Sequence, residues 1–401
     1  MKRFAILASI AVLLAVCCVA LLLRAAGKLP DQFYDASGAE LKGPPGSIIR
    51  SEPMQAFDGA VAWRILYRST GLNGEPIAVS GVVVAPETWM AKGGAPVVAW
   101  AHPTTGIARK CAPSLDADAF RPGKYIPGQS TPGLADMIKR GFVIAATDYV
   151  GLGTAGPHPY LVGLSAGRSV LDSVRAARAL TGAGEQFVVW GHSQGAHAAL
   201  WVGQIAADYA PDLKAAGVAA AAAPTDLASL FEDDKDTLAG EAFGALILLS
   251  WSRVYDTPLD RIVDSRAIVP MDWIGAECMT TRLGLMIDGV ALRFLKQHFL
   301  KADPVTTEPW RDYVIRNTPT HLPPYLPLFI AQGNQDTVVL PAVTNIFVSR
   351  FCKRGGVAKV DEMNADHLSV ASLSARAAIE WIADRFERRP MPNDCEKVAA
   401  G

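Results

Sequence analysis

Apolar runs alternate with helical patterns over most of the chain. The runs at residues 60–69, 77–85, 96–101, 142–147, 187–190, 216–223, 325–331 and 357–361 predict strands, and the continuous runs at 96–101 and 142–147 are typical of strands buried on both faces. Residues 136–139, 164–180, 196–209, 341–353 and 370–386 predict helices from their apolar spacing. Strands that alternate with helices predict an α/β fold with a mostly parallel sheet covered on both faces.

Two stretches depart from this alternation. Residues 28–55 are rich in proline and glycine and are expected to be irregular, ahead of a hairpin turn at residues 71–74. Residues 226–318 lack strand-like runs and contain two long, unusually apolar helical patterns at 238–255 and 278–301. We interpret this second stretch as a helical cap inserted between two core strands; ordinary core helices are the alternative.

These patterns divide the chain into four parts. Residues 44–225 and 319–390 form the expected α/β core, residues 226–318 the cap (lid) insertion, and residues 391–401 a C-terminal tail. The remaining part, residues 1–26, is a signal peptide or an N-terminal membrane anchor, because Lys2 and Arg3 precede an uncharged apolar run at 4–23 that is long enough to span a bilayer. Either reading places the protein outside the cytoplasm, as a secreted or periplasmic protein or one anchored through residues 4–23.

Composition and charge exclude some partners. Half of the 401 residues are apolar, 19% are charged, and the formal net charge is −1. The sequence has no basic tract, no zinc-type spacing of cysteine and histidine, and no glycine-rich phosphate loop, so we expect no nucleic-acid partner and no metal site. The oligomeric state is left open.

Four cysteines lie outside the leader: Cys111, Cys278, Cys352 and Cys395. In an exported protein the simplest expectation is two disulfides. Four cysteines allow three pairings, and their spacing does not choose among them.

The segment Gly191-His192-Ser193-Gln194-Gly195 is a G-x-S-x-G motif between a predicted strand and a predicted helix. A serine on such a strand-to-helix turn is lifted out of the sheet, and the helix N-terminus behind it favours developing negative charge. The flanking positions must be small, because the two backbones crowd there. We therefore predict that Ser193 is a nucleophile; a plain tight turn is the alternative.

A serine hydroxyl needs a base, and the base needs an orienting acid. His367 lies in the loop between the last predicted strand and helix and is the candidate base, with a polar loop histidine as the alternative. The side chain of His192 should turn away from the nucleophile, and His197 should serve packing. His298 and His321, in or beside the cap, could reach a substrate.

The acid should follow a strand upstream of the base. Asp336 comes just after the strand at 325–331, at the edge where parallel sheets place function, and Asp226 is the second choice. The chain order Ser193, Asp336, His367 is the order of the α/β-hydrolase fold. Asp148, at the end of another core strand, should lie near the site in a structural role.

An oxyanion hole needs two N–H donors. Gln194 follows the nucleophile and should supply one. The other should come from the loop after the strand at 96–101; Pro103 has no N–H, so Thr104 is the candidate, with a simple turn as the alternative.

Several segments together carry a resemblance. Residues 102–106, 111–114, 147–153, 191–197, 332–336 and 365–367 resemble the secretory lipases of the α/β-hydrolase superfamily, whose best-known members are fungal lipases of the A type. The resemblance implies a triad of Ser193, Asp336 and His367 and hydrolysis of carboxylic esters or acylglycerols. It also implies a helical cap between the sixth and seventh strands of the sheet, and disulfides Cys111–Cys278 and Cys352–Cys395.

The sequence thus predicts a serine hydrolase, a lipase or esterase, that acts on a lipid or ester substrate through an acyl-enzyme and needs no cofactor. Contact with a membrane or lipid interface is part of this expectation. Two alternatives stay open: an acyltransferase of the cell envelope that uses the same triad, and a non-catalytic binding protein on a hydrolase fold.

Overall fold

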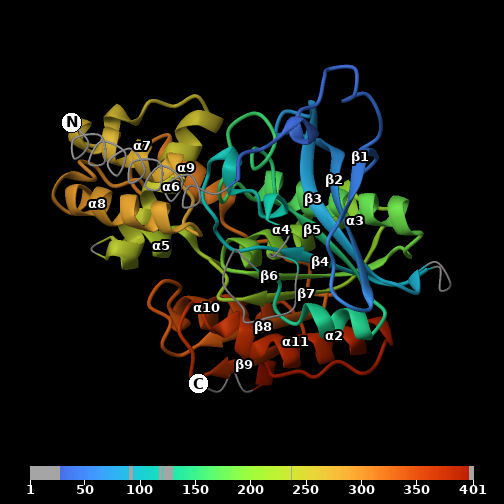
Figure 1. The fold of residues 1–401 in the computed structure, drawn as a ribbon. Helices are drawn as coiled ribbons and strands as arrows, with labels where there is room; N and C mark the ends of the chain where they lie inside the picture. Colours follow the sequence, from blue (N-terminus) through green and yellow to red (C-terminus); the bar gives the residue numbers. More distant parts are fainter. Residues whose placement is uncertain (1–27, 90–93, 117–119, 121–129, 236, 397–401) are drawn as a thin grey trace, which may run out of the picture.

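The computed structural model describes residues 28–89, 94–116, 120, 130–235 and 237–396, which include one sheet of nine strands (Figure 1). The strands are β1 (Ile48–Met54), β2 (Ala60–Thr70), β3 (Pro76–Pro86), β4 (Val97–Ala101), β5 (Val143–Thr147), β6 (Gln186–His192), β7 (Lys214–Ala221), β8 (Leu328–Gly333) and β9 (Ala358–Met363). Their order in the sheet is β1-β2-β3-β5-β4-β6-β7-β8-β9.

The sheet is parallel from β5 to β9 and antiparallel from β1 to β5. This confirms the mostly parallel sheet expected from the sequence. The chain leaves β4 toward β5 on one side, whereas β6 lies on the other side of β4. Such a reversal opens a crevice at the carboxyl ends of the central strands, where open α/β sheets bind ligands.

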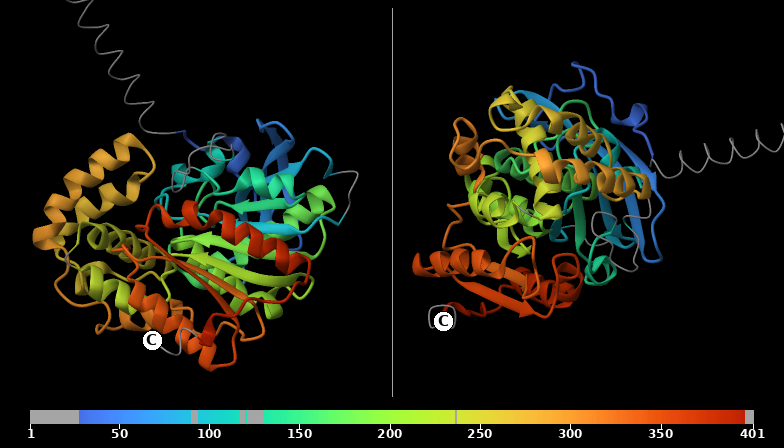
Figure 2. Two further views of the ribbon diagram at one scale, coloured as in Figure 1. Left: turned by 90° about the horizontal axis from the view of Figure 1, so that it is seen from below. Right: turned by 90° about the vertical axis from the view of Figure 1, so that its left-hand side faces the viewer.

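Helices cover both faces of the sheet. They are α2 (Leu134–Lys139), α3 (Gly163–Thr181), α4 (Gln194–Tyr209), α10 (Pro341–Lys353) and α11 (Val370–Phe386). α3, α4 and α10 share a core with one face of the sheet, and α2 and α11 share a second core with the opposite face (Figures 1 and 2). Each face is apolar, since strands such as Val97–Ala101 are buried on both sides.

A group of five helices lies between β7 and β8 and is called here the helical insertion. It comprises α5 (Leu227–Asp234), α6 (Leu238–Val254), α7 (Ile268–Ala276), α8 (Arg282–His298) and α9 (Trp310–Asn317), which stay together at one end of the sheet (Figures 1 and 2). The insertion has its own apolar core, built around side chains such as Trp251, Met271 and Trp310. The two long patterns correspond to α6 and α8; the three shorter helices were not predicted.

The expectation that residues 28–55 are irregular was wrong in part. Residues Ile48–Met54 form β1, which pairs antiparallel with β2. Pro53 fits there because β1 is an edge strand, whose outward side needs no N–H donor. With β1 counted, the insertion follows the seventh strand of the sheet rather than the sixth.

Two disulfides join distant segments. Cys111 is bonded to Cys278 in the insertion, 167 residues away, and Cys352 at the end of α10 is bonded to Cys395, 43 residues away. These are the pairs that the family resemblance implies. The first bond fastens the region after β4 to the insertion, and the second fastens the C-terminal segment to α10.

Candidate active site

Ser193 occupies a strained turn between β6 and α4. Its backbone has φ 55° and ψ −119°, a conformation that residues other than glycine rarely adopt. The backbone N–H of Ser193 donates to the carbonyl of Ala221 at 3.0 Å, which ties the turn to the end of β7. Such strain is characteristic of functional turns, because the surrounding structure must hold it in place.

The two glycines of the motif are required by close backbone contact. A Cβ on Gly191 would lie 2.1 Å from the carbonyl oxygen of Gly195, and a Cβ on Gly195 would lie 1.9 Å from the carbonyl oxygen of Ala101. No side chain fits at these distances. The tight approach brings the start of α4 against the end of β4 and leaves Ser193 at the crest of the turn.

Ser193, His367 and Asp336 form a continuous hydrogen-bonded chain. His367 Nε2 lies 2.9 Å from Ser193 Oγ, and His367 Nδ1 lies 2.9 Å from Asp336 Oδ2. All three side chains are buried. A proton on Nδ1 that is donated to the carboxylate leaves Nε2 free to accept the hydroxyl proton of Ser193, which is the arrangement that activates a serine.

The carboxylate of Asp336 is fixed by its own loop. Its second oxygen, Oδ1, accepts the backbone N–H groups of Val338 and Val339, each at 2.9 Å. The loop between β8 and α10 therefore sets the rotation of the carboxylate and leaves Oδ2 for His367. Orientation of this kind keeps the imidazole in one tautomer.

His192 supports the loop that carries His367. Its ring lies 5.4 Å from the ring of His367, and its Nε2 donates to the backbone carbonyl of His367 at 2.8 Å. Burial, with the neighbouring His367, lowers the pKa of His192 to about 3, so the ring is neutral. The side chain of His192 therefore holds the loop that carries His367 in place, a role that no local sequence pattern indicated.

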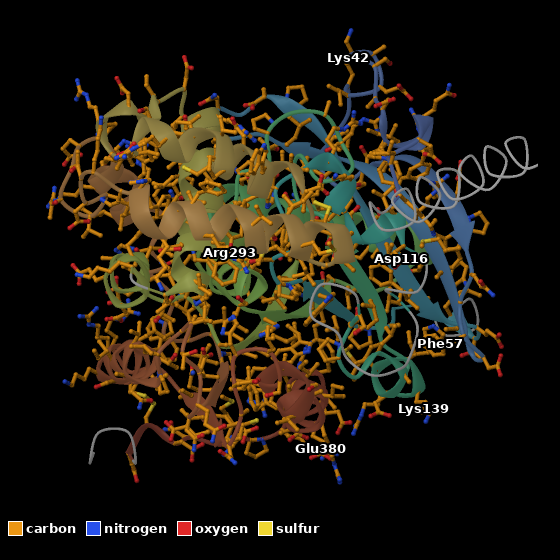
Figure 3. All side chains as sticks on the ribbon, turned by 60° about the vertical axis from the view of Figure 1, so that its left-hand side comes forward. Lys42, Phe57, Asp116, Lys139, Arg293 and Glu380 are labelled. Carbon is orange, nitrogen blue, oxygen red and sulfur yellow. A yellow bond between two sulfur atoms is a disulfide. The ribbon has the colours of Figure 1, made fainter. Side chains whose placement is uncertain are left out.

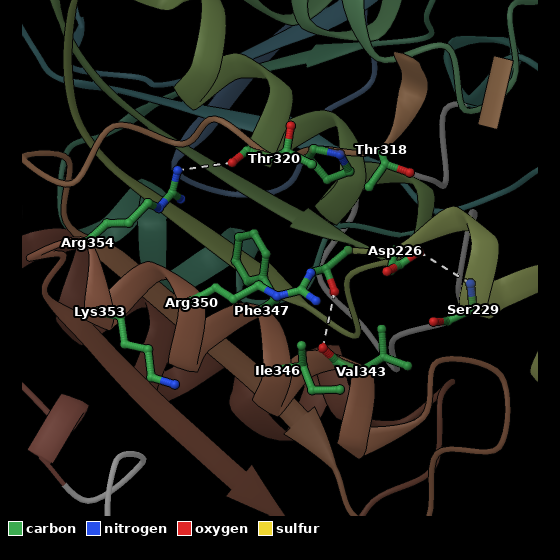
Figure 4. A pocket seen from close by; sticks show the side chains of 12 residues that line it. Asp226, Ser229, Thr318, Thr320, Val343, Ile346, Phe347, Arg350, Lys353 and Arg354 are labelled. Carbon is green, nitrogen blue, oxygen red and sulfur yellow. Dashed lines mark hydrogen bonds between the residues drawn. The ribbon is translucent and has the colours of Figure 1, made fainter. Parts of the chain in front are cut away.

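Asp226, the second choice for the acid, lies elsewhere. Its Oδ1 accepts the N–H groups of Ala228 and Ser229 and so caps the N-terminus of α5. Figure 4 shows Asp226 on the wall of a cavity of about 540 Å³ between α5 and α10, and no member of the Ser193–His367–Asp336 chain lines that cavity.

The other candidate histidines have different partners. His197 is buried, and its Nε2 donates to the carbonyl of Asn317 at 2.7 Å, which links α4 to the end of α9. His298 lies at the C-terminus of α8 beside Arg266, and His321 lies beside Thr320 in the segment after α9. The structure does not bring His298 or His321 into hydrogen-bond contact with the chain formed by Ser193, His367 and Asp336.

The two expected oxyanion loops leave neighbouring strands at the same level. Ala101 pairs with Gly191 where β4 and β6 run parallel. Thr104 and Gln194 each follow three residues after this pair, beyond the ends of the two strands. Gln194 is the first residue of α4, and its N–H is therefore free of an intrahelical partner. The hydroxyl of Thr104 contacts Tyr160 Oη at 2.8 Å.

Asp148, the residue after β5, has a structural role. It accepts hydrogen bonds from Ser80 Oγ at 2.6 Å and from the N–H and hydroxyl of Ser114. Burial raises its pKa to about 6. Its contacts hold β3, β5 and the segment after β4 together, in keeping with the structural role expected of it.

The described residues contain no group of three or more histidine, cysteine or acidic side chains placed to hold a metal ion. Across the same residues, no helix is both long enough and apolar enough to cross a membrane. The expected leader, residues 1–26, lies outside the described part of the chain.

A mixed nine-stranded sheet with a serine elbow, flanking helices and a helical insertion is the architecture of the α/β-hydrolases. The model of the secretory lipase family matches residues 130–394, about two thirds of the chain, and the chain belongs to this family. It is accordingly an enzyme of the carboxylic ester hydrolase class.

Individual relatives are distant but cover most of the chain. Lipase 9 of Candida albicans is 23% identical over 92% of this chain and 84% of its own length. The trichothecene C-3 esterase of Fusarium sporotrichioides is 23% identical over 89% of this chain and 83% of its own. The closed-state structure of Candida antarctica lipase A has a TM-score of 0.74 at 17% identity and covers 92% of this chain and 89% of its own, which confirms the fold.

Proposed function

We propose that the protein hydrolyses carboxylic esters, acylglycerols included, through an acyl-enzyme on Ser193. The observation that carries the proposal is the position of His367, whose two ring nitrogens each lie 2.9 Å from a partner, Ser193 Oγ on one side and Asp336 Oδ2 on the other. In the first step Ser193 Oγ attacks the ester carbonyl while His367 Nε2 accepts its proton.

The tetrahedral intermediate carries its negative charge on the former carbonyl oxygen. We assign the backbone N–H of Gln194 and a donor of Thr104 to this oxyanion, since both follow the paired strands β4 and β6. His367 then protonates the departing alcohol, and Asp336 stabilises the imidazolium in the meantime. Water, activated by the same imidazole, releases the acid and restores Ser193.

Replacement of the nucleophile tests this assignment. Ser193→Ala should lower turnover of p-nitrophenyl esters by more than about 10³-fold, because the acyl-enzyme can no longer form. A fluorophosphonate probe should label the wild type and leave the variant unlabelled. Full activity in Ser193→Ala would refute the proposal, and a wild type that fails to react with the probe would favour a non-catalytic protein.

The insertion supplies a surface suited to contact with a lipid interface. On α8, the apolar side chains of Leu285, Met286, Val290 and Phe294 are more than half exposed. Figure 3 shows Arg293 on the same helix. Met286, Val290 and Phe294 are four residues apart and so share one face of α8. Exposed apolar patches of this kind mark sites of contact with partners or membranes. We propose that α8 contacts the lipid phase when the substrate is water-insoluble.

Assays with a soluble and a water-insoluble substrate distinguish contact of α8 with the lipid phase from the hydrolytic step. The triple variant Met286→Ser, Val290→Ser, Phe294→Ser should retain hydrolysis of a soluble short-chain p-nitrophenyl ester and lose about tenfold on an emulsified triacylglycerol, because less apolar area is buried at the interface. Equal losses on both substrates would contradict a role at the interface. A chain-length series on the wild type then distinguishes an esterase, which prefers short acyl chains, from a lipase.

We infer that the protein acts outside the cytoplasm. The family is described as secretory, and the two disulfides are stable in an oxidising compartment. Cell fractionation tests the location. Edman sequencing of the mature N-terminus then separates a cleaved leader from an anchor through residues 4–23.

A further inference from the structure

The segment from His158 to Tyr160 contacts both residues assigned to the oxyanion hole. Gln194 Nε2 lies 3.1 Å from His158 Nε2, and Thr104 Oγ1 lies 2.8 Å from Tyr160 Oη. The segment is remote in sequence from both partners, and neither contact belongs to the triad.

The hydrogen-bond pattern of His158 fixes the direction of the first contact. Its Nδ1 lies 2.7 Å from the carbonyl oxygen of Val150, which can only accept, so Nδ1 carries the proton. Nε2 is then the acceptor for the amide N–H of Gln194. Within the described residues Gln194 Oε1 has no partner, so the contact with His158 anchors this side chain at the start of α4.

The helical insertion holds this segment through two neighbouring residues of α6, Ser250 and Trp251. Ser250 Oγ on α6 donates to the carbonyl of His158 at 2.7 Å and accepts the N–H of Tyr160 at 2.8 Å. Beside it, Trp251 Nε1 donates to the carbonyl of Tyr160 at 3.0 Å. All of these groups are buried, so breaking any of these hydrogen bonds leaves an unpaired polar atom in the interior.

The insertion holds the loop after β4 as well. The N–H of Met279 donates to the carbonyl of Thr105 at 3.0 Å, Gly106 forms a β-bridge with Cys278, and the Cys111–Cys278 disulfide follows. The loop that carries Thr104 is thus fastened on one side to Tyr160 and on the other to residues 278–279.

We propose that His158 and Tyr160 are positioning residues that set the geometry of the oxyanion hole, and that α6 and residues 278–279 of the insertion hold them and the loop after β4 in place. This inference rests on the proposed function. It gives the insertion a role in the chemistry, because its hydrogen bonds hold the groups that contact Gln194 and Thr104. Preorganised donors account for much of the stabilisation of an oxyanion, so small displacements reduce the rate.

A double-mutant cycle tests the link between Tyr160 and Thr104. Tyr160→Phe removes only the hydroxyl that contacts Thr104, and it should lower kcat for p-nitrophenyl esters by about tenfold while KM stays within about twofold. In a Thr104→Val background the same change should have little further effect, because the contact is already lost. The same fold-loss in both backgrounds would overturn the link.

A second cycle addresses the other donor. Gln194→Met keeps the backbone N–H of residue 194 and removes the amide that contacts His158, and His158→Phe removes the acceptor. Each should lower kcat, and the two losses should not multiply when the changes are combined. Multiplicative losses would show that His158 does not act through Gln194.

Two serines on α6 provide a matched pair for the role of the insertion. Ser250→Ala should lower kcat, whereas Ser252→Ala should not, because Ser252 Oγ donates to the carbonyl of Thr257 within the insertion and makes none of the hydrogen bonds that hold residues 158–160. Melting temperatures of all variants identify those that fail to fold. Equal kcat in both serine variants would refute the role assigned to α6 through Ser250, and because Ser193→Ala is tested separately, that result would leave the nucleophile assignment standing.

Discussion

At the scale of single residues, the carboxylate of Asp336 is oriented by the loop between β8 and α10. One carboxylate oxygen accepts two backbone N–H groups of the loop, and the other accepts from His367. The side chain therefore has no freedom to rotate away, and the imidazole is held in the tautomer that leaves Nε2 facing Ser193.

Asp336→Asn is expected to lower kcat by about 10³–10⁴-fold, because the amide can present an N–H to His367 and so favour the wrong tautomer. Steady-state hydrolysis of a p-nitrophenyl ester measures the loss. The control is Asp226→Asn, at the cap of α5, where asparagine caps a helix as well as aspartate does. Asp226→Asn should keep wild-type kcat; if it shows the larger loss, the acid has been assigned to the wrong residue.

The sequence indicates the triad residues better than their supports. Ser193 lies in a motif, and Asp336 and His367 lie in loops after predicted strands, so periodicity and chain order suggest them as candidates, which the structure brings into hydrogen-bond contact. The hydrogen bond of His192 to the His367 carbonyl and the contact of His158 with Gln194 depend on which loops lie side by side in the fold. No local pattern encodes these contacts, because their partners lie 175 and 36 residues apart.

At the scale of elements, long periodic segments are the easiest to recognise. The long helices α6 and α8, of 17 residues each, gave clear apolar patterns. α5 and α9, of 8 residues each, and α7, of 9, span only about two turns and were missed, although the shorter α2 was predicted in part. β1 was missed for a different reason, since its partner on the sheet, not its composition, makes it a strand.

The two disulfides join different elements and should differ in their effect on activity. By loop-closure entropy, removing either one should lower the free energy of unfolding by a similar amount, about 5 kcal/mol for the 167-residue loop and about 4 kcal/mol for the 43-residue loop. Only the Cys111–Cys278 bond holds the loop that carries Thr104. We therefore expect Cys111→Ser with Cys278→Ser to lower kcat by about tenfold, less than the loss of a whole oxyanion donor.

The paired variant Cys352→Ser with Cys395→Ser is the control for stability. Both double variants should be assayed at a temperature where circular dichroism shows them folded. If both lose the same fraction of kcat, the loss reflects general destabilisation and not the loop after β4.

At the scale of the whole molecule, four buried histidines make folding sensitive to acid. Burial lowers the pKa of His102, His158 and His197 to about 4 and that of His192 to about 3. The unfolded chain protonates these rings below a pH of about 6.5, whereas the folded protein keeps them neutral. Their contribution to stability is therefore complete above that pH and is lost as the pH falls toward 4.

Four carboxyl groups act in the opposite direction. Burial raises the pKa of Asp148 and Asp288 to about 6, so the folded protein holds protons there that the unfolded chain has released. Burial also raises the pKa of Asp172 and Asp361 above the usual range for aspartate. At a pH of about 5.5 the four histidines outweigh Asp148 and Asp288 by roughly two protons, and Asp172 and Asp361 reduce this excess. The free energy of unfolding should therefore fall by at most about 3 kcal/mol for each unit by which the pH is lowered.

Urea unfolding followed by circular dichroism between pH 7 and pH 5 measures this slope. His197→Gln provides the comparison, because glutamine can still donate to the carbonyl of Asn317 but takes up no proton on unfolding. For this variant, the change in the free energy of unfolding per pH unit should be smaller than that of the wild type by about 1.4 kcal/mol, which corresponds to one proton. A wild-type free energy of unfolding that does not change over this range would contradict the assignment of neutral buried histidine rings. Identical slopes in the two proteins would show that His197 is not one of these neutral rings.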